Sequence, residues 1–287
     1  GNLSAAKPLY ERALEITENA LGPEHPSTGT SLNNFARFLV DTSDYDAAEP
    51  LYRRAIAINE KNLGSDHFNT ATIINNLALL RTKKGDLEAA EPMFRRALEI
   101  TENTLGPDHF KTATRLNNLA LLLKNKRDLE AAEPLFRRSL EITEKALGSN
   151  HSKTIMRLKN LASLLKNKGD LEAAEPLYKR ILEIREQAIG PDHPALARDL
   201  QKYGIVLRSL ERHDEALDIL NRALAINEEN AVLDSEEVAS TLSALGKLFE
   251  LQGKYEDSLQ SYSRAITIRE NLVGPLHPDT ARLYFRL

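Results

Sequence analysis

The chain has 287 residues, of which 41% are hydrophobic and 28% charged, and its formal net charge is −4. This composition is typical of a globular protein, and the small negative charge favours neither a nucleic acid nor a membrane surface as a partner. There is no cysteine, which excludes disulfides and thiolate metal sites and makes the reducing cytoplasm the expected compartment. No apolar run approaches the roughly 18–20 residues of a membrane span.

A repeat of 42 residues organises the whole sequence. Glycine and histidine mark it at Gly22, Gly64, Gly106, Gly148, Gly190 and Gly274, and at His25, His67, His109, His151, His193 and His277. A period this regular predicts one stacked array over residues 1–287. We expect a half repeat at 1–22, full repeats at 23–64, 65–106, 107–148, 149–190, 191–232 and 233–274, and a partial repeat at 275–287. Because both ends fall inside a unit, a piece of a longer protein is expected.

Each unit predicts two helices. The chain starts in a second helix, passes through six complete pairs and stops partway through a first helix. In the unit 107–148, the first helix is predicted at about Thr112–Lys126, because Leu116, Leu119, Ala120 and Leu123 recur on one helical face. The second is predicted at about Leu129–Leu147, with Asp128 as its N-cap and Gly148 as its C-cap.

These residues carry a family resemblance. The pattern L-x-x-L-A-x-x-L, followed by G-D-L-x-x-A and F/Y-x-x-A-L, resembles the tetratricopeptide repeat. The long unit, with "NNLA", "AEPMFRRALEI" and "LGPDH", is similar to the repeats of kinesin light chain. The resemblance implies an all-α fold, a right-handed α-solenoid of antiparallel helix pairs. It also implies that the first helices line a concave side, which usually takes a peptide.

The six periodic histidines suggest a metal site, but stacked repeats place equivalent atoms about 10 Å apart. Ligands of one ion must approach it to roughly 2 Å, so we expect the histidines to organise the turns between repeats. The aromatic column Tyr10, Tyr52, Phe94, Phe136 and Tyr178 is expected in the core. No nucleotide-binding or catalytic motif occurs. The sequence therefore predicts a chain that is not an enzyme, with no catalytic residues, metal or cofactor.

A helical wheel identifies the candidate groove. In the helix Thr112–Lys126, the side opposite the core holds Asn118, Leu121 and Asn125, and Asn117 lies on its flank. An asparagine amide can hold the backbone of an extended ligand because it both donates and accepts. Alternatively, the asparagines join neighbouring first helices by hydrogen bonds. The candidate groove residues are Asn34, Asn76, Leu79, Lys83, Asn117, Asn118, Leu121, Asn125, Met156, Lys159, Asn160, Asn167, Arg198 and Lys202.

The first helices in the middle of the chain are basic. Residues 70–85, 112–127 and 154–169 contain eleven lysines and arginines and no acid: Arg81, Lys83, Lys84, Arg115, Lys124, Lys126, Arg127, Arg157, Lys159, Lys166 and Lys168. This favours an acidic ligand. Bases in the last helical turn also complement the helix dipole, which explains eight of them without a ligand.

The sequence therefore predicts a protein–protein interaction scaffold that binds an extended, acidic peptide segment with an apolar anchor. The alternative is a sensor or autoinhibitory arm of a larger signalling enzyme, an ATPase or a protease, whose catalytic domain lies outside this segment. Nucleic acid is a weaker expectation, because exposed aromatics do not alternate with the bases. No membrane partner is expected, and open array ends would allow self-association.

Overall fold

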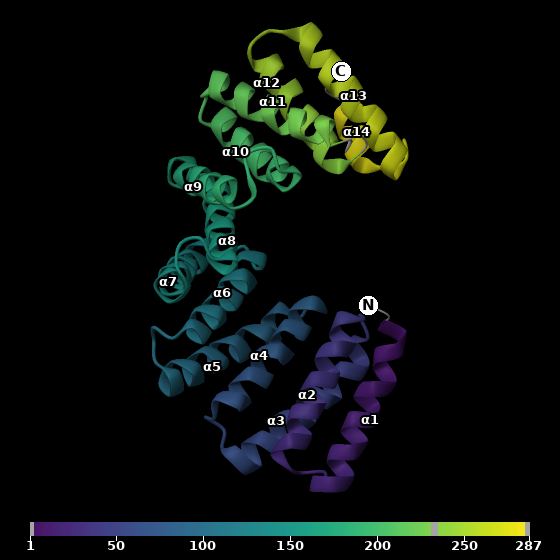
Figure 1. Ribbon diagram of the computed structural model, residues 1–287, viewed down its shortest axis with the longest axis vertical. Coiled ribbons are helices and arrows are strands. Elements are labelled where there is room, and N and C mark those ends of the chain that lie inside the picture. The colour runs from purple at the N-terminus through teal and green to yellow at the C-terminus, as the bar shows by residue number, and fades with distance from the viewer. Residues whose placement is uncertain (1–2, 231–234, 285–287) are drawn as a thin grey trace. The chain divides into compact units, whose positions relative to one another are not determined.

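The computed structural model describes residues 3–230 and 235–284 (Figure 1), and within these ranges every regular element is a helix. The helices are α1 (Leu3–Leu21), α2 (Pro26–Asp41), α3 (Tyr45–Leu63), α4 (Phe68–Lys83), α5 (Leu87–Leu105), α6 (Phe110–Asn125), α7 (Leu129–Leu147), α8 (Ser152–Lys168), α9 (Leu171–Ile189), the 3₁₀ turn η1 (Pro194–Leu196), α10 (Ala197–Ser209), α11 (His213–Glu229), α12 (Glu236–Leu251), α13 (Tyr255–Val273) and α14 (Pro278–Tyr284). The predicted all-α array of helix pairs is confirmed.

The chain divides into two compact units, unit 1 with residues 1–148 and unit 2 with residues 149–287. The division falls between α7 and α8, where one repeat was expected to end and the next to begin. We call α2, α4, α6, α8, α10 and α12 the A helices, and the helices that follow them, together with α1, the B helices. Within each unit, an A helix packs against the B helix that follows it and against the B helix before it.

The core lies between A and B helices. The predicted stripe of α6 is buried, with Leu116, Leu119, Ala120 and Leu123 no more than 2% exposed. Four members of the predicted aromatic column are buried in the same way: Tyr52, Phe94, Phe136 and Tyr178. Tyr10 of α1 is partly buried, and its ring stacks on Phe38 with centroids 4.9 Å apart. Leucine and aromatic burial between helices is the main stabilising contribution in such an array.

The turns between repeats use the residues that mark the period. His109 Nδ1 accepts a hydrogen bond from the backbone N–H of Lys111 at 3.1 Å, and so caps α6. His25, His67, His151 and His193 act in the same way on the helices that follow them. Thr112 Oγ1 donates to the carbonyl of Gly106 at 2.8 Å, which ties the start of α6 to the preceding turn. The expectation that these five histidines organise turns is confirmed.

The B helices have the predicted ends. Helix α7 spans Leu129–Leu147, and Asp128 caps it by accepting from the N–H of Ala131 at 3.1 Å. Gly148 follows with φ of 84°, a left-handed conformation that suits glycine. Helix α6 starts two residues earlier than predicted, at Phe110, because the cap is His109 rather than a residue nearer Thr112.

The A helices are buried over more of their circumference than the helical wheel of a single helix predicts. Arg115, Asn117 and Leu122 of α6 lie off the predicted stripe, and all three are buried. An A helix touches its own B helix, the preceding B helix and the neighbouring A helix, so contact surrounds most of it. Across the described residues, no helix combines the length and the apolar character needed to cross a bilayer.

Candidate functional site

One side of the A helices in unit 1 keeps its side chains at least partly exposed. We call it the A-helix face. It consists of Thr30, Asn34 and Arg37 of α2, Thr72, Asn76, Leu79 and Lys83 of α4, and Thr114, Asn118, Leu121 and Asn125 of α6. Seven of these residues belong to the predicted groove. The face is mainly polar and uncharged, with two leucines in its middle.

Pairs of asparagines join the A helices. Asn76 Nδ2 donates to Oδ1 of Asn33 at 2.9 Å, and Asn118 Nδ2 donates to Oδ1 of Asn75 at 3.0 Å. The second asparagine of one repeat therefore bonds to the first asparagine of the repeat before it. This is the alternative that the sequence left open. No other described contact uses the amide oxygen of Asn76 or Asn118, so each amide is held in place and keeps an acceptor.

The other predicted groove residues of unit 1 differ in exposure. Asn117 is only 3% exposed, so its amide belongs to the packing of α6 and not to an open surface. Leu79 is 38% exposed, and Leu121 is half-buried. Asn34 is exposed at one edge of the face, where it accepts from Asn33 Nδ2 at 3.4 Å. Lys83 and Asn125 are also exposed, at the ends of their helices.

Three basic side chains at the C-terminal ends of α4 and α6 are paired with carboxylates. Lys84 Nζ lies 2.8 Å from a carboxylate oxygen of Asp46, and Lys126 Nζ lies 2.7 Å from a carboxylate oxygen of Glu91. Arg81 is paired with Asp86 at 2.9 Å and also with a glutamate of α3. Hydrogen bonds from Lys126 hold the pKa of Glu91 below its usual value. These carboxylates lie on the B helices or, for Asp86, just before one, so they neutralise part of the basic excess of the A-helix sequence.

A buried arginine lies beneath the A-helix face. Arg115 is 7% exposed, and its Nη2 donates to Oγ1 of Thr72 at 2.9 Å. Burial lowers the pKa of Arg115 to about 10. Its guanidinium also lies 6.0 Å from the ring centroid of Phe68. Arg115 therefore links α4 to α6, and most of its charge is withdrawn from solvent.

Unit 2 presents different groups at the equivalent positions. Lys159 of α8 lies 2.6 Å from Asp199 of α10, and Asp199 is only 4% exposed. Arg185 of α9 lies 3.2 Å from the same carboxylate. Lys202 is half-buried, and its pKa is lowered, chiefly by that burial. The structure thus gathers Lys159 and Lys202 around one buried acid.

The remaining predicted residues of unit 2 lie on its A helices. Met156 is 46% exposed on α8, Asn160 is half-buried there, and Asn167 is exposed near the end of the same helix. Arg198 is exposed at the start of α10, 3.9 Å from Glu237.

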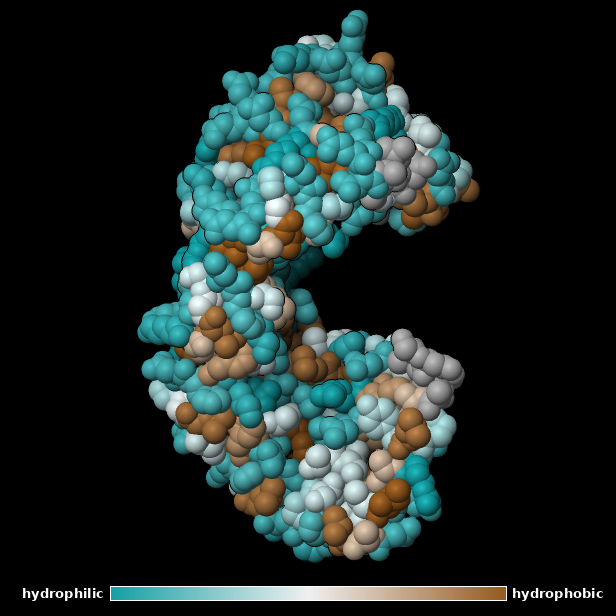
Figure 2. Space-filling model, in the orientation of Figure 1, coloured by the Kyte–Doolittle hydropathy of each residue, from teal (hydrophilic) through white to brown (hydrophobic). Residues whose placement is uncertain are grey.

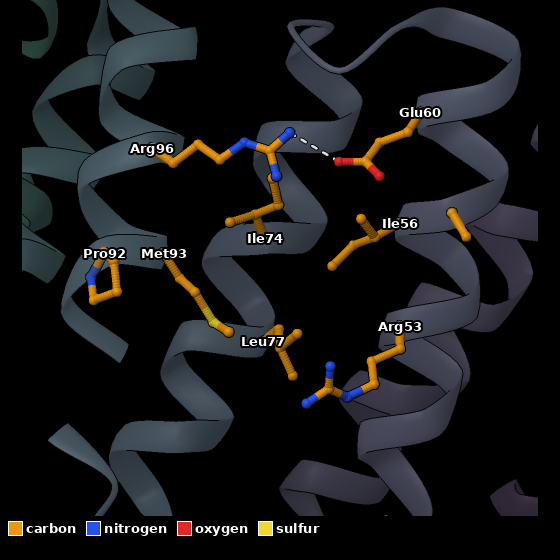
Figure 3. Close-up of a pocket in the computed structure, with 9 residues that line it drawn as sticks. Arg53, Ile56, Glu60, Ile74, Leu77, Pro92, Met93 and Arg96 are labelled. Carbon is orange, nitrogen blue, oxygen red and sulfur yellow. Dashed lines mark hydrogen bonds and ion pairs between the residues drawn. The ribbon is translucent and has the colours of Figure 1, made fainter. Parts of the chain in front are cut away.

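Sequence reasoning missed a hollow on the other side of unit 1. It measures about 360 Å³ and lies between α3, α4 and α5 (Figure 3), with Ile56, Leu77 and Met93 among its walls. Arg96 closes one end by pairing with Glu60 at 2.8 Å. One sequence signal marks it: Ala57 lines the hollow at the position that holds glutamate in the next three repeats, at Glu99, Glu141 and Glu183. Elsewhere, hydrophobic surface appears as separate patches among hydrophilic residues (Figure 2).

Comparisons with known proteins show what this arrangement of helices is similar to. The family model for the tetratricopeptide repeat matches residues 1–61, 30–103, 69–145, 116–187, 154–229 and 237–287. A search of curated proteins finds no match to the chain.

Solved structures with a similar fold include nearly identical TPR-like repeats assigned to a kinesin light chain of Podosopora anserina. This structure has 21% identity and a TM-score of 0.66, and the match covers 72% of this chain and 98% of that one. BtubC (BKLC) from P. vanneervenii has 21% identity and a TM-score of 0.58, and the match covers 97% of this chain and 94% of that one. YrrB, described as a TPR protein with an unusual peptide-binding site, has 18% identity and a TM-score of 0.52, over 80% of this chain and 96% of that one.

At these identities the structures support the fold alone, and the family model supplies the assignment. It matches most of the chain in successive, overlapping segments, as a repeated unit requires. The chain belongs to the tetratricopeptide repeat family, and its structural neighbours include proteins with kinesin-light-chain-like repeats.

Proposed function

We propose that the A-helix face of unit 1 binds an extended peptide segment of a partner protein. Tetratricopeptide arrays serve in general as scaffolds for protein interaction, and one structural neighbour is described as having a peptide-binding site. The observation that carries the proposal is the row of amides that the asparagine pairs hold in register across α2, α4 and α6.

The amides suit a peptide backbone. Each of Asn76 and Asn118 donates one N–H to the asparagine of the preceding repeat. Its amide oxygen and its second N–H remain available to a ligand. Because the pairing fixes the side-chain rotamer, less conformational entropy is lost when a ligand binds. Backbone contacts of this kind hold an extended segment with little regard to its side chains.

Leu79 supplies an apolar contact between the amides. It is 38% exposed on a helix whose other leucines are buried, so a ligand side chain would remove it from water. Full burial of a leucine contributes about 1.5–3 kcal/mol, and covering the exposed part of Leu79 contributes a fraction of that. Leu121, at the same position one repeat later, extends this contact.

An acidic preference is the finer part of the proposal. Since Lys84 and Lys126 are paired with carboxylates, the attraction must come from the bases left open on the face, Arg37 and Lys83. Two exposed charges give a modest preference that weakens as salt rises. We therefore expect acidic residues to improve binding without being required for it.

Peptide selection followed by affinity measurement tests the proposal. Peptides selected from a random library on the immobilised chain are measured against wild type and against the double variant Asn76→Ala, Asn118→Ala. We expect the double variant to bind about tenfold or more weakly, because two hydrogen-bonding groups are lost. Far-UV circular dichroism should report unchanged helicity.

A matched control is Asn103→Ala, which removes an exposed asparagine from the B helix α5. This variant should bind the selected peptides like wild type. Equal affinity of wild type and the double variant would remove the proposed role of the amides. An acidic preference is supported if replacing the peptide's acids by amides weakens binding more at low salt than at high salt.

A further inference from the structure

A second hollow of unit 1 opens on the A-helix face between α2 and α4. It measures about 300 Å³ and is lined by Thr30, Asn33, Asn59, Asn69, Thr72 and Ile73. We call it the amide pocket. Five of its six lining residues are polar, and none of them carries a formal charge. Its floor is Asn59, which comes from the B helix α3.

Asn59 is buried without a partner. Its side chain is 3% exposed, its Oδ1 atom is fully enclosed, and no described residue forms a hydrogen bond with its amide. A buried amide normally finds partners, because leaving its donors and acceptors unpaired costs stability. The Oδ1 atom of Asn59 faces Gly29, so the capacity that Asn59 leaves open to the hollow is that of its unpaired Nδ2 donors.

Three residues make this pocket differ from the same place one repeat later. There Ala71, Thr101 and Arg115 stand where this pocket has Gly29, Asn59 and Ile73. Thr101 is satisfied by its own helix, since its Oγ1 donates to the carbonyl of Ala97 at 2.6 Å. Arg115 extends to Thr72 and occupies space that the shorter Ile73 leaves open.

Gly29 makes room for the unusual asparagine. A Cβ atom at this position would lie 2.8 Å from Oδ1 of Asn59, closer than such atoms approach in proteins. The glycine, the asparagine and the isoleucine therefore form a matched set, and together they create a polar space that the next repeat fills with its own side chains.

The same asparagine recurs in unit 2. Asn227 stands four repeats after Asn59, is also buried, and has an unpaired Nδ2 atom. It lines a hollow of about 360 Å³ whose rim includes Arg198 and Glu237. The rim of that hollow is charged, whereas the amide pocket of unit 1 is neutral, so the two would take different groups.

We propose that the amide pocket binds a neutral carboxamide group, the side chain of a glutamine or asparagine in the bound segment. A carboxamide offers one acceptor, which suits the unpaired Nδ2 donors of Asn59, and two donors, which suit the oxygen atoms of the other polar lining residues. A carboxylate or an ammonium group would lose its water among six lining residues that carry no charge, which is unfavourable. The proposal rests on the peptide-binding function of this face for its source of carboxamide, but the pocket can be probed without a peptide.

Propionamide is the probe, and nuclear magnetic resonance of the full chain labelled with ¹⁵N-asparagine is the measurement. The side-chain amide signals of Asn33 and Asn69, which line the pocket, are followed during titration. We expect a saturable shift with a dissociation constant on the order of millimolar, as befits a ligand of five heavy atoms. Propionate, which has the same shape and a negative charge, should produce no saturable shift.

Two variants introduce the residues that the next repeat carries at the equivalent positions. Asn59→Thr should weaken propionamide binding about tenfold or more, because the amide partner is lost. Ile73→Arg should abolish it by filling the pocket, since Thr30 can accept from the new arginine as Thr72 accepts from Arg115. Asn103→Thr, on the outer side of α5, is the control and should change nothing.

The proposal is overturned if propionamide gives no saturable shift, if propionate binds equally well, or if Asn59→Thr binds propionamide like wild type. The first result means that the pocket holds water only, and the other two mean that it does not recognise a carboxamide through Asn59. The comparison of propionamide with propionate needs no variant, so a misfolded variant does not leave the question open. If propionamide binds but no peptide does, the peptide-binding function is refuted and the carboxamide site is retained. If peptides bind with no preference for glutamine or asparagine, the carboxamide site is refuted and the peptide-binding function is retained.

Discussion

The A helices of units 1 and 2 are joined by different chemistry at the same step of the repeat. In unit 1, Asn118 donates to Asn75 and both groups stay neutral. In unit 2, Lys159 occupies the position of Asn75, and it pairs with the buried carboxylate of Asp199 on the next A helix. The helical frame is the same in both, so the side chains that join neighbouring repeats can change while the repeat itself persists.

The difference has energetic and functional consequences. An amide pair costs little to bury because each partner satisfies the other. A buried ion pair is costly to desolvate and is strongly destabilising when one partner is removed. Unit 1 therefore presents a mainly uncharged face with ordered amides, and unit 2 presents a surface around Lys202 and Arg198 whose charge depends on one buried acid.

Removing that acid should have the largest effect. Asp199→Asn keeps the size of the side chain but leaves Lys159 and Arg185 without their shared carboxylate. We expect a loss of about 2–3 kcal/mol in the free energy of unfolding, less than for a fully buried pair because both bases are partly exposed. Urea unfolding followed by circular dichroism measures it.

The control for that variant is Asp192→Asn, which changes an exposed aspartate just before the 3₁₀ turn η1. It should alter stability by less than about 0.5 kcal/mol. If Asp199→Asn were no more destabilising than this control, the buried ion pair would not be what joins α8 to α10.

The corresponding change in unit 1 should be smaller. Asn75→Ala removes the acceptor of Asn118 and leaves a small cavity, and we expect a loss of about 1–2 kcal/mol. Unfolding in urea again gives the value. If Asn75→Ala lowered the free energy of unfolding as much as Asp199→Asn or more, the contrast between the units would be contradicted.

The charge pairs between repeats make stability depend on pH. Hydrogen bonds from Lys126 and Arg95 lower the pKa of Glu91 below its usual value of 4.5. The contribution of its carboxylate is therefore complete above that value and is lost as pH falls through the lowered pKa. Glu91→Gln should cost about 0.5–1 kcal/mol at neutral pH, and the difference should vanish in acid. Thermal unfolding at a series of pH values tests this, and a difference that persists in strong acid would exclude the charge explanation.

The smallest effect is expected on the outer side of unit 1. Ala57→Glu restores the residue that three later repeats carry and partly fills the hollow beside Met93 and Ile56. Stability should change by less than about 0.5 kcal/mol. Peptide binding should be unchanged, because the substitution lies away from the A-helix face. A large loss of peptide affinity in this variant would move the binding site to the outer hollow.

Local features of the sequence predict the fold well. The heptad-like spacing of Leu116, Leu119 and Leu123 predicts the core face of α6, and Asp128 and Gly148 predict both ends of α7. These signals are local because a helix and its caps are set by residues a few positions apart.

The candidate site is harder to predict because its partners are one repeat away. The wheel of one helix leaves Asn117 on an open flank, but a neighbouring repeat buries it. Part of the basic excess of the A helices is likewise neutralised, because Lys84 pairs with Asp46 and Lys126 pairs with Glu88, both pairs being 38 residues apart. Comparing charges at that separation would have found the pairing in the sequence. The unpaired amide of Asn59 leaves a weaker signal, an asparagine where the next two repeats have threonine.

The most direct test of peptide binding at the A-helix face is a nuclear magnetic resonance titration with a selected peptide. It follows the side-chain amide signals of Asn34, Asn76 and Asn118. We predict that these signals shift together and saturate at one peptide concentration, while the signal of Asn103 stays in place. Shifts confined to the outer side of unit 1, or to the asparagines of unit 2, would contradict it.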